Sequence, residues 1–213
     1  MRQVILILLL ISGGMMADAF AQPDTLWTKT YGGRAYDRFY CSQPLDDGVI
    51  AVGYTRSNPE NVNDIMVVRT DTVGNVLWYR IFGGDSSDIA RYVVPVQSGG
   101  FVVAGQTDSY GTDWEDAILI RYTDTGDTLW VRRFSYGSML RERIYCLKQT
   151  FDQGFILAGF LGDHFSYDTN ILIIKTDSLG NEEWHRSYGG VRDDLAFSVE
   201  QTPDSGYIIS GST

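Results

Sequence analysis

Residues 91–134 read RYVVPVQSGGFVVAGQTDSYGTDWEDAILIRYTDTGDTLWVRRF, and this segment is the most informative about the fold. It contains four runs rich in strand-forming residues, which we predict at 91–97, 101–107, 117–122 and 128–134. Residues typical of turns separate the runs, and Ser98-Gly99-Gly100 suits a tight hairpin. Four short runs joined in this way predict an antiparallel sheet of four strands.

The same pattern occurs four times, and its clearest marker is a tryptophan. The tryptophans are spaced by 51, 52 and 54 residues, at Trp27, Trp78, Trp130 and Trp184. An acidic residue follows each of them after an aromatic residue and a glycine-containing turn, at Asp37, Asp88, Glu142 and Asp194. An aspartate also marks the turn before the next tryptophan, at Asp71, Asp124 and Asp177. A period near 50 residues indicates a repeat architecture, with copies at about 27–77, 78–129 and 130–183 and an incomplete copy at 184–213.

Four short antiparallel strands in each repeat are typical of the blade of a β-propeller. We therefore predict an all-β fold, a β-propeller of four-stranded antiparallel blades whose last repeat is incomplete. The alternative is a solenoid of stacked hairpins, although the coils of a β-helix contain fewer strands per repeat. The fourth copy stops after its second run, so we expect the chain to be part of a larger propeller. The alternative is a four-bladed ring with one incomplete blade.

The first 21 residues have the features of a signal peptide that is removed during export. Arg2 supplies a basic start, residues 4–11 are strongly apolar, and Ala19-Phe20-Ala21 fits a cleavage site. The apolar stretch is too short to cross a bilayer as a helix, which takes about 20 residues. We expect a mature chain of residues 22–213 in the periplasm, at the cell surface or outside the cell, with no transmembrane anchor.

The composition suits one ordered domain. Hydrophobic residues make up 44% of the chain and aromatic residues 13%, so burial of apolar surface can offset the entropy of ordering. The formal net charge of -10 argues against nucleic acid as a partner, because a binding groove for a polyanion is basic.

The two cysteines, Cys41 and Cys146, occupy matching places in the first and third copies. Export makes a disulfide chemically accessible, but the bond needs Cα atoms about 5.5 Å apart. Matching places in non-adjacent repeats are farther apart than this unless the ring is very small. We expect two free thiols, and pairing stays open for a small closed ring.

The repeat can be written as W-x-x-x-aromatic-G-G-x-x-x-D, then D-G-G-aromatic-I-V-A-G-x-T, then I-L-I-K-T-D-x-x-G-N-x-x-W. In this form it resembles the SBBP-type β-propeller repeats of bacteria, over nearly the whole mature chain. The resemblance implies an exported or cell-surface protein and brings no described activity. The turn at residues 70–78 also resembles the turns of quinoprotein repeats and the Asp-box of sialidases, which are structural motifs.

The loops between the second and third runs differ most between copies. They span residues 56–63, 108–115 and 161–169, and their aromatic rings are the candidates for ligand binding: Tyr110, Trp114, His164, Phe165 and Tyr167. Aromatic rings beside carboxylates can stack on sugar rings or hold a protein. We expect an unknown protein or glycan as the partner at this end; the alternative is that the rings only cover blade edges.

Calcium is a possible ligand of the second loop, which holds Asp108, Asp113 and Asp116. Hard cations prefer oxygen ligands, but the spacing differs from that of a dedicated calcium loop. No other cofactor is predicted.

The acidic residues of the repeat, including Asp71, Asp124 and Asp177, are assigned to the scaffold as turn caps or as hydrogen-bond acceptors between blades, because they recur from copy to copy. The alternative is a ring of carboxylates for a cation or an acid–base pair. The chain has no Gly-x-Ser-x-Gly elbow, no His-Glu-x-x-His and no phosphate loop, so no catalytic residue is predicted. We expect a noncatalytic extracellular scaffold or interaction module. The alternatives are a carbohydrate- or calcium-binding module and, after these, a quinoprotein-like oxidoreductase or a sialidase-like glycoside hydrolase.

Overall fold

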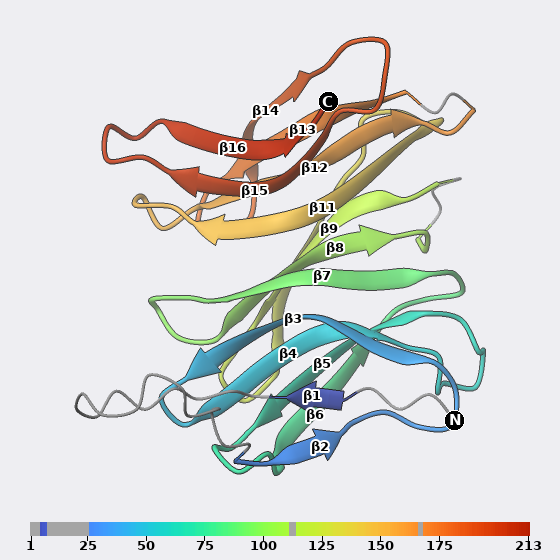
Figure 1. Cartoon of the computed structure of the whole chain (residues 1–213), viewed down its shortest axis with the longest axis vertical. Helices are drawn as coiled ribbons and strands as arrows, with labels where there is room; N and C mark the ends of the chain where they lie inside the picture. Colours follow the sequence, from blue (N-terminus) through green and yellow to red (C-terminus); the bar gives the residue numbers. More distant parts are fainter. Residues whose placement is uncertain (1–4, 8–25, 111–113, 166–167) are drawn as a thin grey trace, which may run out of the picture.

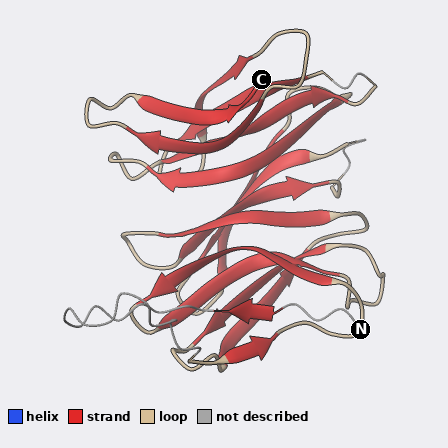
Figure 2. Ribbon diagram, viewed as in Figure 1, coloured by secondary structure: helices blue, strands red, loops and turns tan. Residues whose placement is uncertain are grey.

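The computed structural model describes residues 5–7, 26–110, 114–165 and 168–213. Within these residues all regular structure is β-strand, arranged in antiparallel sheets that lie one above another (Figure 1, Figure 2). This part of the chain contains no helix that is long and apolar enough to cross a membrane. Asp113, Tyr167 and most of the predicted signal peptide lie outside the described residues.

Three of the described sheets have four strands each, and neighbouring strands follow one another in the chain. Sheet I consists of β3 (Asp37–Leu45), β4 (Gly48–Thr55), β5 (Asp64–Thr70) and β6 (Val76–Phe82). Sheet II consists of β7 (Asp88–Pro95), β8 (Phe101–Thr107), β9 (Asp116–Tyr122) and β10 (Thr128–Phe134). Sheet III consists of β11 (Leu140–Gln149), β12 (Phe155–Asp163), β13 (Thr169–Thr176) and β14 (Glu182–Tyr188). Sheet IV consists of β15 (Leu195–Gln201) and β16 (Tyr207–Ser212).

The all-β class and the four-stranded antiparallel sheets predicted from the sequence are confirmed. In sheet II, the second and fourth strands have the predicted bounds. The first begins three residues early, at Asp88, because its pairing with β8 extends to Asp88 opposite Thr107. The sequence repeats begin at the tryptophan, which lies in the last strand of each complete sheet, so the repeats and the sheets are out of phase by one strand.

Both faces of sheet II are covered, which explains its uninterrupted apolar runs. Val103 of β8 packs with Ile50 of sheet I, and its neighbour Val102 packs with Leu157 of sheet III. Successive side chains of a strand point to opposite faces, so a strand buried on both faces is apolar along its length. All residues of β8 and β9 are accordingly buried.

The described sheets form an open stack (Figure 1). Sheet IV covers the outer face of sheet III through Ala196 and Val199. Its own outer face is uncovered, since the Phe197 and Ile208 side chains are 52% and 64% exposed.

At the other end of the stack a short two-stranded sheet joins β1 (Ile5–Ile7) to β2 (Thr28–Thr30). β1 lies within the predicted signal peptide. Cleavage after Ala21 would therefore leave β2 without this partner.

A β-bulge interrupts the pairing of the first and second strands at the same place in each sheet I–IV. One residue of the first strand has no partner, and these residues are Tyr40, Arg91, Tyr145 and Phe197. The second strand has a glycine beside the bulge, at Gly53, Gly105, Gly159 and Gly211. A Cβ atom on any of these glycines would lie 1.8–2.0 Å from a carbonyl oxygen of the first strand. The glycine that ends each apolar run is thus required by the close approach of two backbones.

Candidate functional site

The acidic residue that follows each glycine-containing turn accepts a backbone hydrogen bond from that turn. Asp37, Asp88 and Asp194 accept from Gly33 N, Gly84 N and Gly190 N at 2.8, 2.9 and 2.8 Å. Glu142, which follows a turn longer by two residues, accepts from Tyr136 N at 3.0 Å. Their positions are those of turn caps, at the end of the stack where one sheet passes into the next.

Like Asp88, Glu142 is a completely buried carboxyl group. Its side chain is fully buried, Oε2 has no hydrogen-bond partner, and burial raises its pKa to about 7. A carboxyl group with this pKa suits proton transfer, but complete burial keeps it out of contact with a substrate.

A second series of caps lies at the opposite end, in the turn between the third and fourth strands. Asp71 Oδ1 accepts from Asn75 N, and Asp177 Oδ1 accepts from Asn181 N, both at 2.8 Å. In sheet II the equivalent acceptor is the hydroxyl of Thr123, which accepts from Asp127 N at 2.9 Å.

Asp124 does not occupy the place of Asp71 and Asp177, because it lies one position farther along the turn. Its carboxylate accepts from Gly100 N at 2.7 Å and so caps the neighbouring hairpin instead. A threonine hydroxyl can replace the aspartate at the first position because both are short acceptors.

Three of the five predicted ligand-binding rings form one group, which we call the loop cluster: Trp114, His164 and Phe165. Trp114 comes from the loop before β9, and the other two come from the loop before β13. The rings of Trp114 and His164 are stacked with centroids 3.2 Å apart, and Phe165 meets Trp114 edge-on at 6.4 Å. Phe165 is 74% exposed. Loops of two neighbouring sheets thus bring three aromatic rings into contact, and one of them, Phe165, faces solvent.

Tyr110 lies at the junction of sheets I and II. Its hydroxyl donates to Gly83 O at 2.9 Å, its ring lies 6.0 Å from that of Phe82, and Arg133 lies over it at 5.7 Å. Tyr167 falls outside the described residues.

The candidate calcium ligands Asp108 and Asp116 lie beside a partly buried ion pair. Glu115 binds the guanidinium of Arg143 through both carboxylate oxygens. Burial and, next, the charge of Glu115 raise the pKa of Asp108 to about 6, and its Oδ1 has no hydrogen-bond partner. In the part of the chain that the structure describes, which excludes Asp113, no three His, Cys, Asp or Glu side chains are grouped closely enough for a metal ion.

The four bulged residues form a row that sequence reasoning missed. The guanidinium of Arg91 lies 4.2 Å from the ring centre of Tyr40 and 5.9 Å from that of Tyr145. The ring of Tyr145 lies 5.7 Å from that of Phe197. Each sheet thus contributes one residue to a continuous cation–π and aromatic contact along the first strands. The sequence contains a signal for this row, because each of its residues is the third after the acidic cap of its copy.

A groove of about 870 Å³ lies between sheets I and II at the end opposite the loop cluster. Asp47, Arg69, Trp78 and Asp124 are among its lining residues. Arg69 is paired with Asp47, and Asp124 caps a hairpin, so both side chains are already bound within the protein.

No protein-family model and no curated protein matches the chain.

Proposed function

We propose that the chain is an exported, noncatalytic scaffold or interaction module built from β-propeller blades. Four features support the blade architecture: the sheets are antiparallel, their strands follow chain order, they stack face to face, and the last strand of each complete sheet leads directly into the first strand of the next. The spacing of the tryptophans and the resemblance to SBBP-type repeats favour the same architecture.

The loop cluster is the observation that carries the interaction role. A large exposed ring on a rigid aromatic base is the kind of group that anchors a protein or a sugar ring. Phe165 has this exposure, and Trp114 and His164 supply the base beneath it. We propose a protein or a glycan as the partner at this face.

Binding to an array of glycans and to proteins of the cell envelope tests the role, followed by titration of each binder against variants. Phe165→Ala is expected to weaken binding about tenfold or more, as removal of an interface anchor does. The matched control is Phe151→Ala, which removes another exposed ring (66%) from sheet III, in the turn between β11 and β12. If both variants lost affinity for the binder equally, or neither lost affinity, the loop cluster would not be the binding site.

Calcium binding at the second loop is a second candidate, favoured by the unpartnered Oδ1 of Asp108 beside Glu115. A divalent cation would offset the repulsion between these carboxylates. Calcium is then expected to raise the melting temperature of the chain, and Asp108→Asn is expected to abolish the rise. Equal shifts in the parent chain and in the variant would place the cation elsewhere.

The identity of the N-terminal residue of the secreted product tests whether the chain is exported and cleaved. Cleavage after Ala21 yields a chain that begins at Gln22, and N-terminal sequencing of material from the periplasm or medium detects it. Retention of Met1 in exported material would contradict the proposal.

A further inference from the structure

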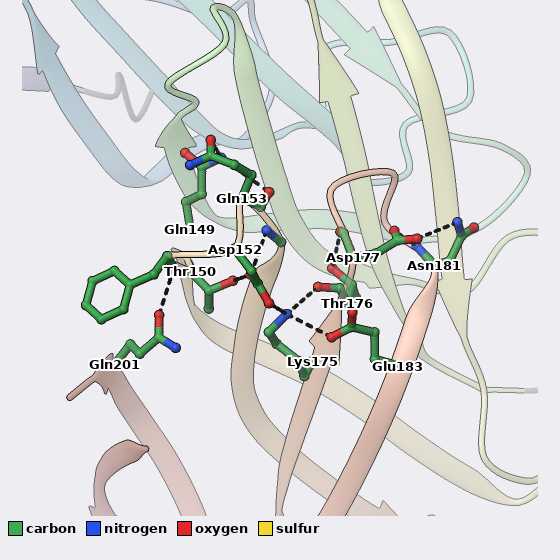
Figure 3. Close-up of polar contacts among 12 residues, drawn as sticks. Gln149, Thr150, Asp152, Gln153, Lys175, Thr176, Asp177, Asn181, Glu183 and Gln201 are labelled. Carbon is green, nitrogen blue, oxygen red and sulfur yellow. Dashed lines mark hydrogen bonds and ion pairs between the residues drawn. The ribbon is translucent and has the colours of Figure 1, made fainter. Parts of the chain in front are cut away.

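A glutamine side chain links the first hairpins of neighbouring sheets at two junctions of the stack. Gln149 Oε1 accepts from the backbone N–H of Gln97 in sheet II at 3.1 Å. Gln201 Oε1 accepts from the backbone N–H of Phe151 in sheet III at 2.8 Å, and Figure 3 shows Gln201 directed at this hairpin. Each glutamine is the seventh residue after the acidic cap of its sheet, and each N–H belongs to the ninth residue after the cap of the preceding sheet. We call this contact the carboxamide link.

The junction between sheets I and II lacks the carboxamide link. The seventh residue after the cap of sheet II is Pro95, whose side chain has no hydrogen-bonding group. The hairpin of sheet I is also one residue shorter than that of sheet II. The N–H that a link would engage is that of Asp46, and it forms no hydrogen bond with another described residue.

The groove of about 870 Å³ between sheets I and II lies at the same place. Asp46 and Pro95 both line it, so the groove includes the position where the link is missing. Small-molecule sites are typically clefts of about 300–1,000 Å³. The apolar part of the wall comes from Leu45, Leu77, Trp78 and Phe101. Leu77 is 55% exposed, so a ligand can reach this wall from solvent.

Most charged groups of the groove are already bound within the protein. Arg69 pairs with Asp47, and the guanidinium of Arg80 donates to backbone carbonyls. Asp124 accepts from a hairpin N–H through one oxygen, Oδ1. The carboxylate of Asp46, like its N–H, forms no hydrogen bond or ion pair with another described residue. Asp46 therefore offers a ligand one donor and one acceptor beside an apolar wall.

An acetamido group matches this combination. Its carbonyl can accept from Asp46 N–H, as the glutamine carboxamides accept from the equivalent N–H groups at the other junctions. Its own N–H can donate to the Asp46 carboxylate, and its methyl group suits the apolar wall. The hydroxyl groups of a sugar ring supply further donors for Oδ2 of Asp124.

We propose that the groove between sheets I and II binds a saccharide that carries acetamido groups. The amide of the sugar takes the place of the glutamine carboxamide that Pro95 does not supply. The groove lies at the end opposite the loop cluster, so this site is independent of binding there.

Trimers of N-acetylglucosamine, glucosamine and glucose test the site on the full chain. The acetylated trimer is expected to bind and to shift the NMR signal of the Asp46 amide. The glucose trimer has no amide and is expected to bind about tenfold more weakly or worse. The glucosamine trimer has cationic amines instead and is also expected to bind more weakly than the acetylated trimer. Equal or tighter binding of the glucosamine trimer would mean that charge, rather than the amide, is recognised, and would overturn the proposal.

Pro95→Gln restores the glutamine of the other junctions. Its carboxamide is expected to occupy the site and to weaken binding of the acetylated trimer about tenfold or more. The matched control is Pro44→Gln, which makes the same change at the seventh residue after the cap of sheet I, outside the residues that line the groove. This control is expected to bind as the parent chain does.

Asp46→Pro removes the N–H and the carboxylate together and is also expected to weaken binding about tenfold or more. Pro203 has the corresponding place in sheet IV, so a hairpin of this chain accepts proline there. Thermal unfolding shows that each variant is folded. Absence of binding by the acetylated trimer, or unchanged binding in folded Pro95→Gln or Asp46→Pro, would overturn the proposal. Phe165→Ala is expected to leave this binding unchanged, which separates the groove from the loop cluster.

Discussion

The indole ring of Trp78 in sheet I lies against the backbone of Gly126 in sheet II. A Cβ atom at Gly126 would come within 2.8 Å of Cδ2 of the ring, and Trp78 Nε1 donates to Asp124 O at 2.7 Å. Gly126 also has a φ of +82°, a conformation that favours glycine. The contact between the two sheets thus depends on a residue without a side chain.

Gly126→Ala is expected to lower the free energy of unfolding by about 2–4 kcal/mol. About 1 kcal/mol comes from the positive φ, and about 1–3 kcal/mol from displacement of the ring. Urea unfolding followed by tryptophan fluorescence measures the loss. Gly190→Ala is the control, because a Cβ atom at Gly190 would meet nothing within 4 Å. Equal losses in both variants would show that the ring contact is not the cause.

Glu142 makes stability depend on pH. Burial raises its pKa to about 7 in the folded chain, above the ordinary value of 4.5, so the folded state binds this proton more tightly than the unfolded state. The stabilisation is complete below pH 4.5 and is lost as pH rises through about 7.

Glu142→Gln is expected to remove this pH dependence. Relative to the parent chain, the free energy of unfolding of the variant should therefore rise by a few kcal/mol between pH 4.5 and about 7. Chemical denaturation at pH 4.5 to 8 measures the difference. Glu60→Gln, which changes an exposed carboxylate, is expected to follow the parent chain. A pH-independent difference between Glu142→Gln and the parent would rule out the buried titration.

Lys175→Met is expected to destabilise the chain at pH 7 by about 1–3 kcal/mol, since it leaves Asp152 and Glu183 without their shared cation. Burial alone would raise the pKa of Asp152, but the bonds from Lys175 and Thr150 outweigh it and lower the pKa to about 2. The carboxylate therefore contributes stability above pH 3.8 that is lost as pH falls through about 2. The difference between variant and parent should shrink across this window.

Lys148→Met serves as the matched control, because Lys148 pairs with Glu200 and both side chains are partly exposed. Its expected cost is below about 1 kcal/mol. Thermal unfolding at pH 2, 3, 4 and 7 compares the two variants, and a constant gap between Lys175→Met and the parent would refute the role of Asp152.

The two cysteines are expected to remain thiols even after export. Cys41 Sγ lies 4.0 Å from Val93 O in sheet II, and Cys146 Sγ lies 4.0 Å from Val199 O in sheet IV, so each points into a different junction. Burial raises the pKa of the Cys41 thiol and slows its reaction. A thiol reagent should label two groups per chain in denaturant without reductant, and fewer groups in the native state. Two unreactive cysteines in the denaturant would demonstrate a disulfide.

The strands could be predicted because their causes are local. Residues 101–107 and 128–134 are bounded by turn residues, and the structure gives the same bounds. The sequence predicted Asp124 as the cap of the turn between β9 and β10, but Thr123 is the acceptor there. Both are short acceptors at neighbouring positions, and only the backbone geometry distinguishes them.

The buried cations were also missed. Lys175 follows an apolar run, and a lysine at the end of a strand is ordinarily solvated. Its burial depends on Asp152, which lies 23 residues away in the sequence, so no local pattern reveals it. The recurrence of a cation one residue before the end of the third strand, at Arg69 and Arg121 as well, was the available signal.

The placement of a tryptophan on the glycine of the next sheet has an evolutionary consequence. Trp27, Trp78 and Trp130 contact Gly74, Gly126 and Gly180 in turn, so every such interface uses the same two groups. An in-frame duplication or deletion of one unit leaves a tryptophan opposite a glycine at each new interface. This contact can therefore be retained when a single genetic event changes the number of units.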